Sequence, residues 1–164
     1  PGAASALMDM AIGSLLGTGE KIIIGDNGFF GERLAEIARG YGLNAITLNA
    51  PLGKPLEPHE LTDVIKLHPE AKVVALVHHE TGTTVLNPLE ELARVASEAG
   101  KVVVVDAVSS LGGADVRTDE WGIDVCVTTP NKCLEAVPGI GLSASHRAPG
   151  NWLTVTIIQI MDGI

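Results

Sequence analysis

Val102-Val103-Val104-Val105-Asp106 is an unbroken apolar run that ends in a carboxylate, and this stretch decides the fold. Continuous valine is typical of a strand that is buried on both faces of a parallel sheet. A charge at the mouth of such a strand is costly unless it has a use there. Asp106 is therefore both the end of a core strand and a candidate functional residue.

Further apolar runs alternate with helical patterns along the chain. We expect strands at 21–24, 44–48, 73–78, 102–106, 124–129 and 139–144, and helices at 6–16, 31–41, 58–67 and 88–99. Asn87 is a candidate N-cap of the last of these helices, and Gly100 follows its end. The segment 50–57, rich in proline and glycine, is expected to be an exposed loop. The alternation predicts an α/β fold with a mostly parallel sheet and helices on both faces.

Composition narrows the class of protein. The chain has 164 residues, of which 46% are hydrophobic but only 3% aromatic, so the core must be aliphatic. The net charge of −9 argues against a nucleic-acid partner, because there is no basic stripe to neutralise phosphates. The cysteines, Cys126 and Cys133, do not form a disulfide framework. The sequence offers no membrane-spanning stretch and no signal peptide, so a cytoplasmic enzyme is the default expectation.

Two residues after predicted strands carry the chemistry. Asp106 can pair with a cationic ring nitrogen, and Lys132, in a turn-rich segment, can attack an aldehyde as a free amine. One cofactor, pyridoxal phosphate, has both groups, at opposite ends of one ring. The alternatives are a helix N-cap for Asp106 and an ordinary surface lysine for Lys132.

Two further segments fit the same cofactor. Gly2-Ala3-Ala4-Ser5 precedes a predicted helix, and small residues there let backbone N–H groups approach a phosphate. Asn27-Gly28-Phe29-Phe30-Gly31 places an aromatic ring between glycines directly after a strand, where it can lie flat on a planar ligand. The alternatives are an empty helix cap and a core anchor for the loop.

His78, His79 and Glu80 suggest a metal cluster at first sight. Adjacent histidines on a strand point to opposite faces, and no third ligand recurs at a matching spacing, so we expect no metal site. Glu80 and Thr81 are more plausibly hydrogen-bond partners of a cofactor or of each other.

These motifs together resemble the large domain of class V aminotransferases, which are pyridoxal phosphate enzymes of fold type I. The resemblance extends to about Arg147. It is most specific in four blocks, which are 27–33, 79–88, 105–113 and 131–139.

The resemblance implies a role for each matching residue. Lys132 matches the lysine that bonds to the cofactor's aldehyde, and Asp106 matches the partner of the pyridine nitrogen. Val108 and Phe30 match the residues on the two faces of the ring, and Thr81 matches the hydroxyl residue near the phenolic oxygen. The phosphate-binding turn is matched by Ala3, Ala4 and Ser5.

The chain departs from the family pattern in two places. Ala4 replaces the usual glycine of the phosphate-binding turn, and Gly82-Thr83-Thr84 replaces the usual Ser/Thr-Thr-Gly. Either change could alter cofactor affinity or loop geometry without removing the core chemistry.

The resemblance also implies a domain organisation. Residues 1–147 match the cofactor-binding large domain, and 148–164 match a segment that relatives carry further downstream, as if an internal gap lay between. The chain opens on Pro1-Gly2 without a methionine, which suggests a fragment or a chain with missing parts. The small domain, which in relatives carries an arginine for the substrate carboxylate, is absent or incomplete.

The implied activity is transamination by a cytoplasmic homodimer, from a small amine or amino acid to pyruvate or glyoxylate. The candidate groups are 2-aminoethylphosphonate–pyruvate, alanine–glyoxylate or serine–pyruvate, and ureidoglycine–glyoxylate aminotransferases, with a preference for the first. One alternative is a lyase or desulfurase on the same scaffold, although Cys133, next to Lys132, is poorly placed as a mobile catalytic thiol. Another is a non-catalytic binding module, which the missing substrate arginine favours.

Overall fold

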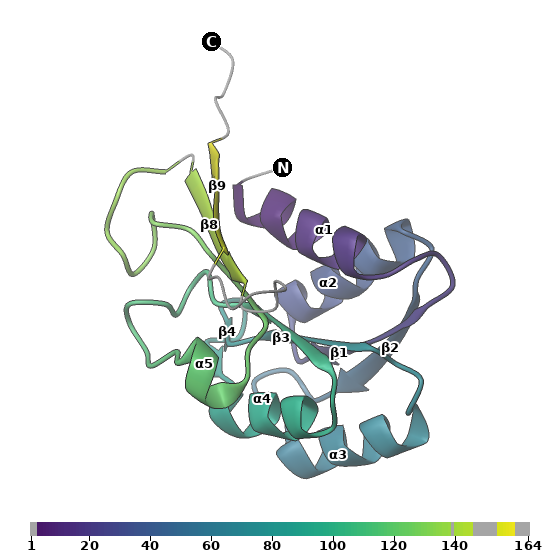
Figure 1. Ribbon diagram of the computed structural model, residues 1–164. Coiled ribbons are helices and arrows are strands. Elements are labelled where there is room, and N and C mark those ends of the chain that lie inside the picture. Colours follow the sequence, from purple (N-terminus) through teal and green to yellow (C-terminus); the bar gives the residue numbers. More distant parts are fainter. Residues whose placement is uncertain (1–2, 139, 146–153, 160–164) are drawn as a thin grey trace.

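The computed structural model describes residues 3–138, 140–145 and 154–159, and the sheet runs through the middle of this part of the chain (Figure 1). Its seven strands lie in the order β2-β1-β3-β6-β7-β8-β9. Their bounds are Lys21–Asp26 (β1), Asn44–Asn49 (β2), Val73–Val77 (β3), Val102–Asp106 (β6), Val125–Thr128 (β7), Ile140–Ser145 (β8) and Thr154–Gln159 (β9). The predicted strands are thus confirmed to within one or two residues at most ends, whereas β9 was not predicted.

The first five strands in this order are parallel, and β8 and β9 extend the sheet in antiparallel pairs. The α/β fold with a mostly parallel sheet is therefore confirmed. A separate two-stranded hairpin, β4 (His79–Glu80) with β5 (Val85–Leu86), projects directly after β3. Because β4 is only two residues long, it is too short to be predicted from the periodicity of the sequence.

Helices cover both faces of the sheet (Figure 1). On one face lie α1 (Ala3–Leu15) and α2 (Phe29–Gly40); on the other lie α3 (Pro58–Leu67), α4 (Leu89–Glu98) and the short α5 (Thr118–Trp121). The strands alternate their side chains between the two faces. Ile22 and Ile24 join the cluster under α1 and α2, and Ile23 joins the cluster under α3 and α4. The period of two along a strand therefore divides one apolar run between two cores.

The start of α4 corrects one prediction. Its N-cap is Pro88, and Asn87 makes no capping bond because its side chain is used elsewhere. Asn87 donates to the carbonyl of Val77, accepts from the amide of Leu56, and pairs with Asn27 through both side chains. This buried amide pair ties the ends of β1 and β3 to the loop at 50–57. Gly100 does follow the helix, with a φ of 73°.

The loop at 50–57 is largely exposed, as expected, but Leu56 is completely buried in the core. Its side chain fills the space beside Gly25, where a Cβ would lie 2.5 Å from Leu56 Cδ1. The loop is thus anchored at its end by the buried side chain of Leu56 and by the hydrogen bond from the Leu56 backbone amide to the side chain of Asn87.

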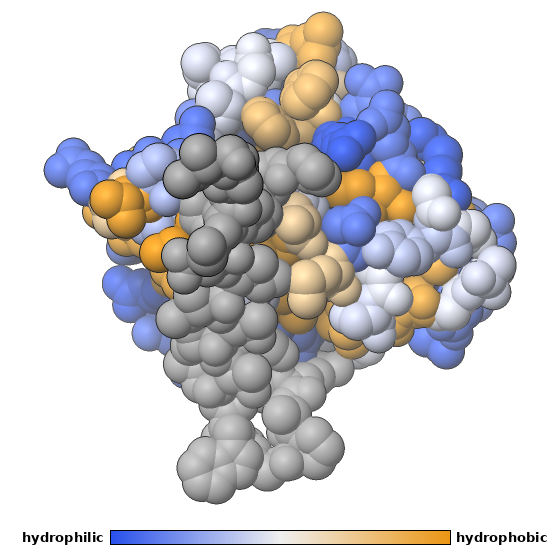
Figure 2. Space-filling model, turned by 90° about the horizontal axis from the view of Figure 1, so that it is seen from above, coloured by the Kyte–Doolittle hydropathy of each residue, from blue (hydrophilic) through white to orange (hydrophobic). Residues whose placement is uncertain are grey.

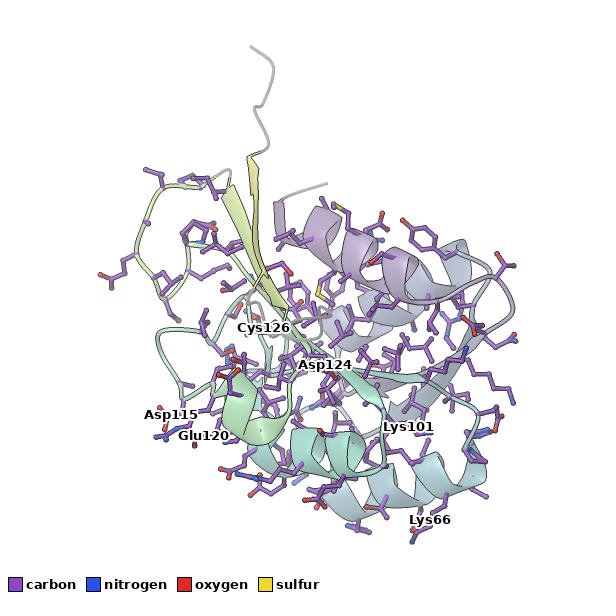
Figure 3. All side chains as sticks on the ribbon, viewed as in Figure 1. Lys66, Lys101, Asp115, Glu120, Asp124 and Cys126 are labelled. Carbon is purple, nitrogen blue, oxygen red and sulfur yellow. The ribbon has the colours of Figure 1, made fainter. Side chains whose placement is uncertain are left out.

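Two side chains at the start of β7, Asp124 and Cys126, are buried in the core. Asp124, just before β7, accepts a bond of 2.8 Å from the amide of Val103 and lies at the sheet beside Cys126 (Figure 3). Burial raises the pKa of the Cys126 thiol to about 12, with a smaller effect from Asp106. Cys126 is therefore an inert core thiol, and neither it nor the exposed Cys133 is in a disulfide, as predicted.

The surface of the described residues mixes charged and apolar groups. Figure 2 shows apolar groups (orange) separated by hydrophilic ones (blue) on the upper face. Exposed large side chains include Met10, Phe29, Phe30, Leu134 and Val137. Within the described residues, none of the helices is both long enough and apolar enough to cross a membrane.

Candidate active site

The carboxyl ends of the parallel strands meet at one edge of the sheet, and the candidate site lies there, as expected for an open α/β sheet. Asp106 is the last residue of β6. Its Oδ1 accepts a 3.0 Å bond from the amide of Val108, two residues on. Ala107 to Ser110 form turns rather than a helix, so the alternative of Asp106 as a helix N-cap is wrong.

The electrostatic state of Asp106 is unusual. Burial raises its pKa to about 6, the Val108 amide lowers that pKa, and the nearby carboxylate of Glu80 raises it again. A partly buried carboxylate next to a second carboxylate gains from any cation placed against it. Asp106 is therefore suited to pair with a positively charged ligand group.

A narrow cavity brings four of the sequence-predicted residues together. Ala4 and Ser5 from the start of α1, Phe30 from α2, and Asp106 all line it. A wider cavity, lined by Ser5, Phe29 and Phe30 among others, shares Ser5 and Phe30 with it. The ring of Phe30, the first turn of α1 and the carboxylate of Asp106 thus line the same narrow cavity.

The start of α2 positions Phe30. Its N-cap, Gly28, has no side chain to cap the helix, and the amides of Phe30 and Gly31 instead donate to Oε2 of Glu80, at 2.9 and 3.3 Å. Gly31 packs against β1, where a Cβ would lie 2.7 Å from the Cα of Asp26. Phe29 and Phe30 contact each other edge to face at 5.2 Å. Phe30 is 37% exposed and lines the cavity with Asp106, so it does not anchor the loop in the core.

Thr81 connects the hairpin to the loop after β6. Its hydroxyl donates to the hydroxyl of Ser109 at 2.8 Å. Because Ser109 follows Val108 directly, this bond brings the predicted hydroxyl residue Thr81 next to the Asp106–Val108 turn. Thr81 is exposed, so its oxygen remains accessible to a ligand.

Lys132 lies in the loop between β7 and β8 and is exposed. It is not among the described residues that line the cavity of Asp106. The neighbouring Cys133 thiol donates to the carbonyl of Ser109 at 3.6 Å, and Leu134 packs where a Cβ on Gly112 would lie. The Lys132 segment is thus held against the loop that follows Asp106.

The turn after β4 carries the departure from the family pattern. Thr84 has a φ of 57°, in the left-handed region that a β-branched residue rarely adopts. In the family pattern, glycine stands here, and it takes this conformation without strain. The sequence departure at Thr84 therefore corresponds to a strained turn.

The histidines lie beside this turn. His78 is buried, and burial lowers its pKa to about 4, with a smaller effect from His79. Within the described residues, the buried side-chain atoms that lack a hydrogen-bond partner are Nδ1 of His78, Nδ1 of His79 and Oγ1 of Thr83. No group of three metal-ligating side chains occurs within that same part of the chain.

Three residues at this edge are absent from the site predicted from sequence. Glu80 was weighed only as a hydrogen-bond partner, yet it holds the start of α2. Ser109 links Thr81 to Cys133, and Arg33 lines the cavity with Asp106. A signal for Glu80 existed, since a carboxylate at the end of a buried strand needs several donors. Ser109 and Arg33 lie within the family blocks 105–113 and 27–33, but the sequence assigned them no role, because their positions at the site depend on segments that are distant in sequence.

Some predictions fall outside the described residues. Gly2 of the phosphate-binding turn lies there, and so do the side chain of Ala3 and the proposed domain boundary at 147–148. Helix α1 itself starts at Ala3, three residues before the predicted start, so Ala4 and Ser5 form its first turn.

The comparisons with known proteins point to one family. The sequence profile of the family described as aminotransferase class-V matches residues 2–153. An uncharacterised aminotransferase of Methanocaldococcus jannaschii is 38% identical over 148 residues, which are 90% of this chain and 38% of that protein. A 2-aminoethylphosphonate–pyruvate transaminase of Vibrio cholerae is 38% identical over 149 residues, 90% of this chain and 40% of that protein.

Solved structures give the same result. The alanine–glyoxylate aminotransferase of Nostoc sp. superposes with a TM-score of 0.84 at 33% identity, over 89% of this chain and 38% of that chain. The chain therefore spans about 40% of the length of the relatives that it matches. With a family profile that extends over nearly all of its residues, the chain belongs to the class V aminotransferases.

Proposed function

We propose that the chain is the cofactor-binding part of a pyridoxal phosphate-dependent aminotransferase. The amino donor is a small amine or amino acid, such as 2-aminoethylphosphonate, alanine or serine, and the acceptor is pyruvate or glyoxylate. Membership of the family supports the reaction type, and the similarity to a 2-aminoethylphosphonate–pyruvate transaminase supports the first of these donors.

One observation carries the proposal. The carboxylate of Asp106 lines a cavity with Ala4, Ser5 and Phe30, and burial raises its pKa to about 6. A protonated ring nitrogen would offset the cost of that burial, Phe30 would cover a flat ring, and the first turn of α1 would face an anion. These residues fit the two charged ends of pyridoxal phosphate.

Each residue then has a defined task. Pyridoxal phosphate, when bound, supplies an aldehyde and an electron-withdrawing ring. Asp106 would keep the ring nitrogen protonated, and Phe30 and Val108 would hold the two faces of the ring. The amides at Ala3, Ala4 and Ser5, together with the Ser5 hydroxyl, bind the phosphate.

The remaining tasks concern proton movement. The amine of Lys132 would hold the cofactor at its aldehyde carbon and, when free, would move a proton at the α-carbon of the substrate. The Thr81 hydroxyl would donate to the phenolic oxygen of the cofactor, and the Ser109 hydroxyl, which accepts from Thr81 at 2.8 Å in this structure, would then donate to Thr81 and orient it. Family resemblance supports a homodimer in the cytoplasm, and light scattering of the purified protein tests the dimer.

The test of the reaction is a donor screen on the full-length protein. We expect pyridoxal phosphate-dependent formation of alanine from pyruvate with 2-aminoethylphosphonate, and of glycine from glyoxylate with alanine or serine as the alternatives. Cofactor binding without turnover of any donor would contradict the aminotransferase and leave a binding module. Release of sulfide from cysteine instead would identify a desulfurase.

A further inference from the structure

Glu80 is a buried carboxylate with an unusual set of partners. It is completely buried, and its two oxygens accept bonds from three backbone amides. Oε2 takes the amides of Phe30 and Gly31, and Oε1 takes the amide of Gly82 at 3.2 Å. Backbone amides and the positive end of a helix can hold a buried negative charge without a side-chain cation.

The two sides of this carboxylate belong to different parts of the site. Phe30 and Gly31 are the first turn of α2, whose own N-cap residue has no side chain to supply a capping bond. Gly82 belongs to the strained turn that follows Thr81. One side chain thus joins the element that carries the Phe30 ring to the turn that carries the Thr81 hydroxyl.

Gly28 makes this arrangement possible. A Cβ at position 28 would lie 2.5 Å from Cγ and 2.6 Å from Cδ of Glu80, closer than side chains pack. The φ of Gly28 is 168°, an extended conformation open to any residue, so the requirement for glycine here is steric. The space that the glycine leaves is the space that Glu80 fills.

We propose that Glu80 is a positioning residue of the active site, which holds Phe30 and Thr81 at fixed places around the cavity that Asp106 lines. The proposal rests on the proposed function, because the ring that Phe30 covers is the cofactor. The negative charge of Glu80 also raises the pKa of Asp106. This effect is smaller than that of burial and that of the hydrogen bond from Val108.

Two substitutions separate geometry from charge. Glu80→Gln keeps the length of the side chain but removes the charge and turns one acceptor into a donor that faces a backbone N–H. Glu80→Asp keeps the charge, but its side chain is one methylene shorter and cannot reach both the start of α2 and the amide of Gly82. Glu60→Gln, on the exposed first turn of α3, is the matched control for the loss of a carboxylate.

The experiment measures these variants in the full-length protein in two ways. Amide chemical shifts of Phe30, Gly31 and Gly82, without cofactor, report the three bonds. The visible absorbance of bound pyridoxal phosphate, titrated with cofactor and with pH, reports the site. We expect Glu80→Gln and Glu80→Asp to weaken cofactor binding about tenfold or more. Only the Gln variant should lower the pH midpoint of that absorbance, whereas Glu60→Gln should change neither.

Three results would contradict the proposal in different ways. Loss of thermal stability, with parent affinity and parent pH profile in both variants, would give Glu80 a merely structural role. Unchanged shifts of the three amides would show that the carboxylate does not hold them. A parent protein that binds no pyridoxal phosphate would instead overturn the proposed function, and this inference with it.

Discussion

The proton on Asp106 links stability to function. Because its folded pKa, about 6, lies above the ordinary value of 3.8, the folded chain binds more protons than the unfolded chain between these values. The cost of the buried charge is therefore absent below pH 4 and complete above pH 6. His78 acts in the opposite sense: its folded pKa of about 4 lies below 6.5, so the stability that depends on neutral His78 is lost as the pH falls between these values.

Asp106→Asn should therefore stabilise the protein in the absence of cofactor at pH 7, by up to about 3 kcal/mol, and change stability little at pH 4. The amide oxygen can still accept the bond from Val108. Urea unfolding at several pH values measures the difference. With the contribution of Asp106 removed, the variant should lose stability more steeply than the parent as the pH falls from 6.5 to 4, because His78 remains. A variant less stable than the parent at pH 7 would contradict the raised pKa.

Thr84 is the second residue whose state is measurable. Its φ of 57° is strained for a β-branched side chain, so Thr84→Gly should stabilise the fold by about 1 kcal/mol. Thr47→Gly, in strand β2, should instead destabilise the fold, because a glycine weakens a strand and Thr47 has no strained φ that glycine would relieve. Thermal unfolding of both variants tests this. Equal effects of the two substitutions would argue against strain at Thr84.

At the scale of elements, the start of α2 depends on the absence of a side chain at Gly28. Gly28→Ala should displace Glu80, because the new Cβ would lie 2.5 Å from its Cγ, and should lower both stability and cofactor affinity. Gly40→Ala, at the end of the same helix, meets no atom within 4 Å and should be tolerated. Cofactor titration with the two variants makes the comparison. Similar affinities would mean that the start of α2 does not position the site.

The Asn27–Asn87 pair joins three elements in the core. Asn87→Ala should cost about 3 kcal/mol, because it leaves the amide of Leu56, the carbonyl of Val77 and the side chain of Asn27 without their partner. Chemical denaturation gives the value. A loss below about 1 kcal/mol would mean that water replaces these bonds without cost.

The elements themselves could be predicted from local signals. Continuous apolar runs marked the strands, and the helix at 58–67 was predicted with its observed bounds, because Pro58 opens it and the apolar period is regular. The cap of α4 could not be predicted, since Asn87 forms bonds with residues that are distant in sequence. The antiparallel direction of β8 depends on the length and path of the loop before it, which periodicity does not report.

The candidate site divides in the same way. Asp106 and Phe30 were found because a charge ends a buried strand and a ring stands between glycines, and both line one cavity. The roles of Val108 and Thr81 came from family resemblance, whereas that of Lys132 was inferred from its position and supported by the resemblance; all three stay predictions. Glu80 and Ser109 were missed as site residues because their contribution lies in bonds between the hairpin, α2 and the loop after β6.

At the scale of the whole molecule, the sheet gathers residues from separate segments at one edge. The ends of β1, β3, β6 and β7 lie side by side, and α1 and α2 cover the same face (Figure 1). The end of β6 supplies Asp106, and the segments after β1, β3 and β7 supply Phe30, Glu80 and Lys132. The fold thus explains why residues that are about a hundred positions apart in sequence can serve one ligand.

The central claim is that Lys132 and Asp106 serve a single molecule of pyridoxal phosphate. The most direct measurement is the visible absorbance of the full-length protein after cofactor is added and excess is removed, for the parent, Lys132→Ala and Lys66→Ala. Lys66 is an exposed lysine on the outer face of α3 (Figure 3) and serves as the control. The account predicts a band from covalently bound cofactor that is present in the parent and in Lys66→Ala but lost in Lys132→Ala. An unchanged band in Lys132→Ala, or no band in the parent, would contradict it.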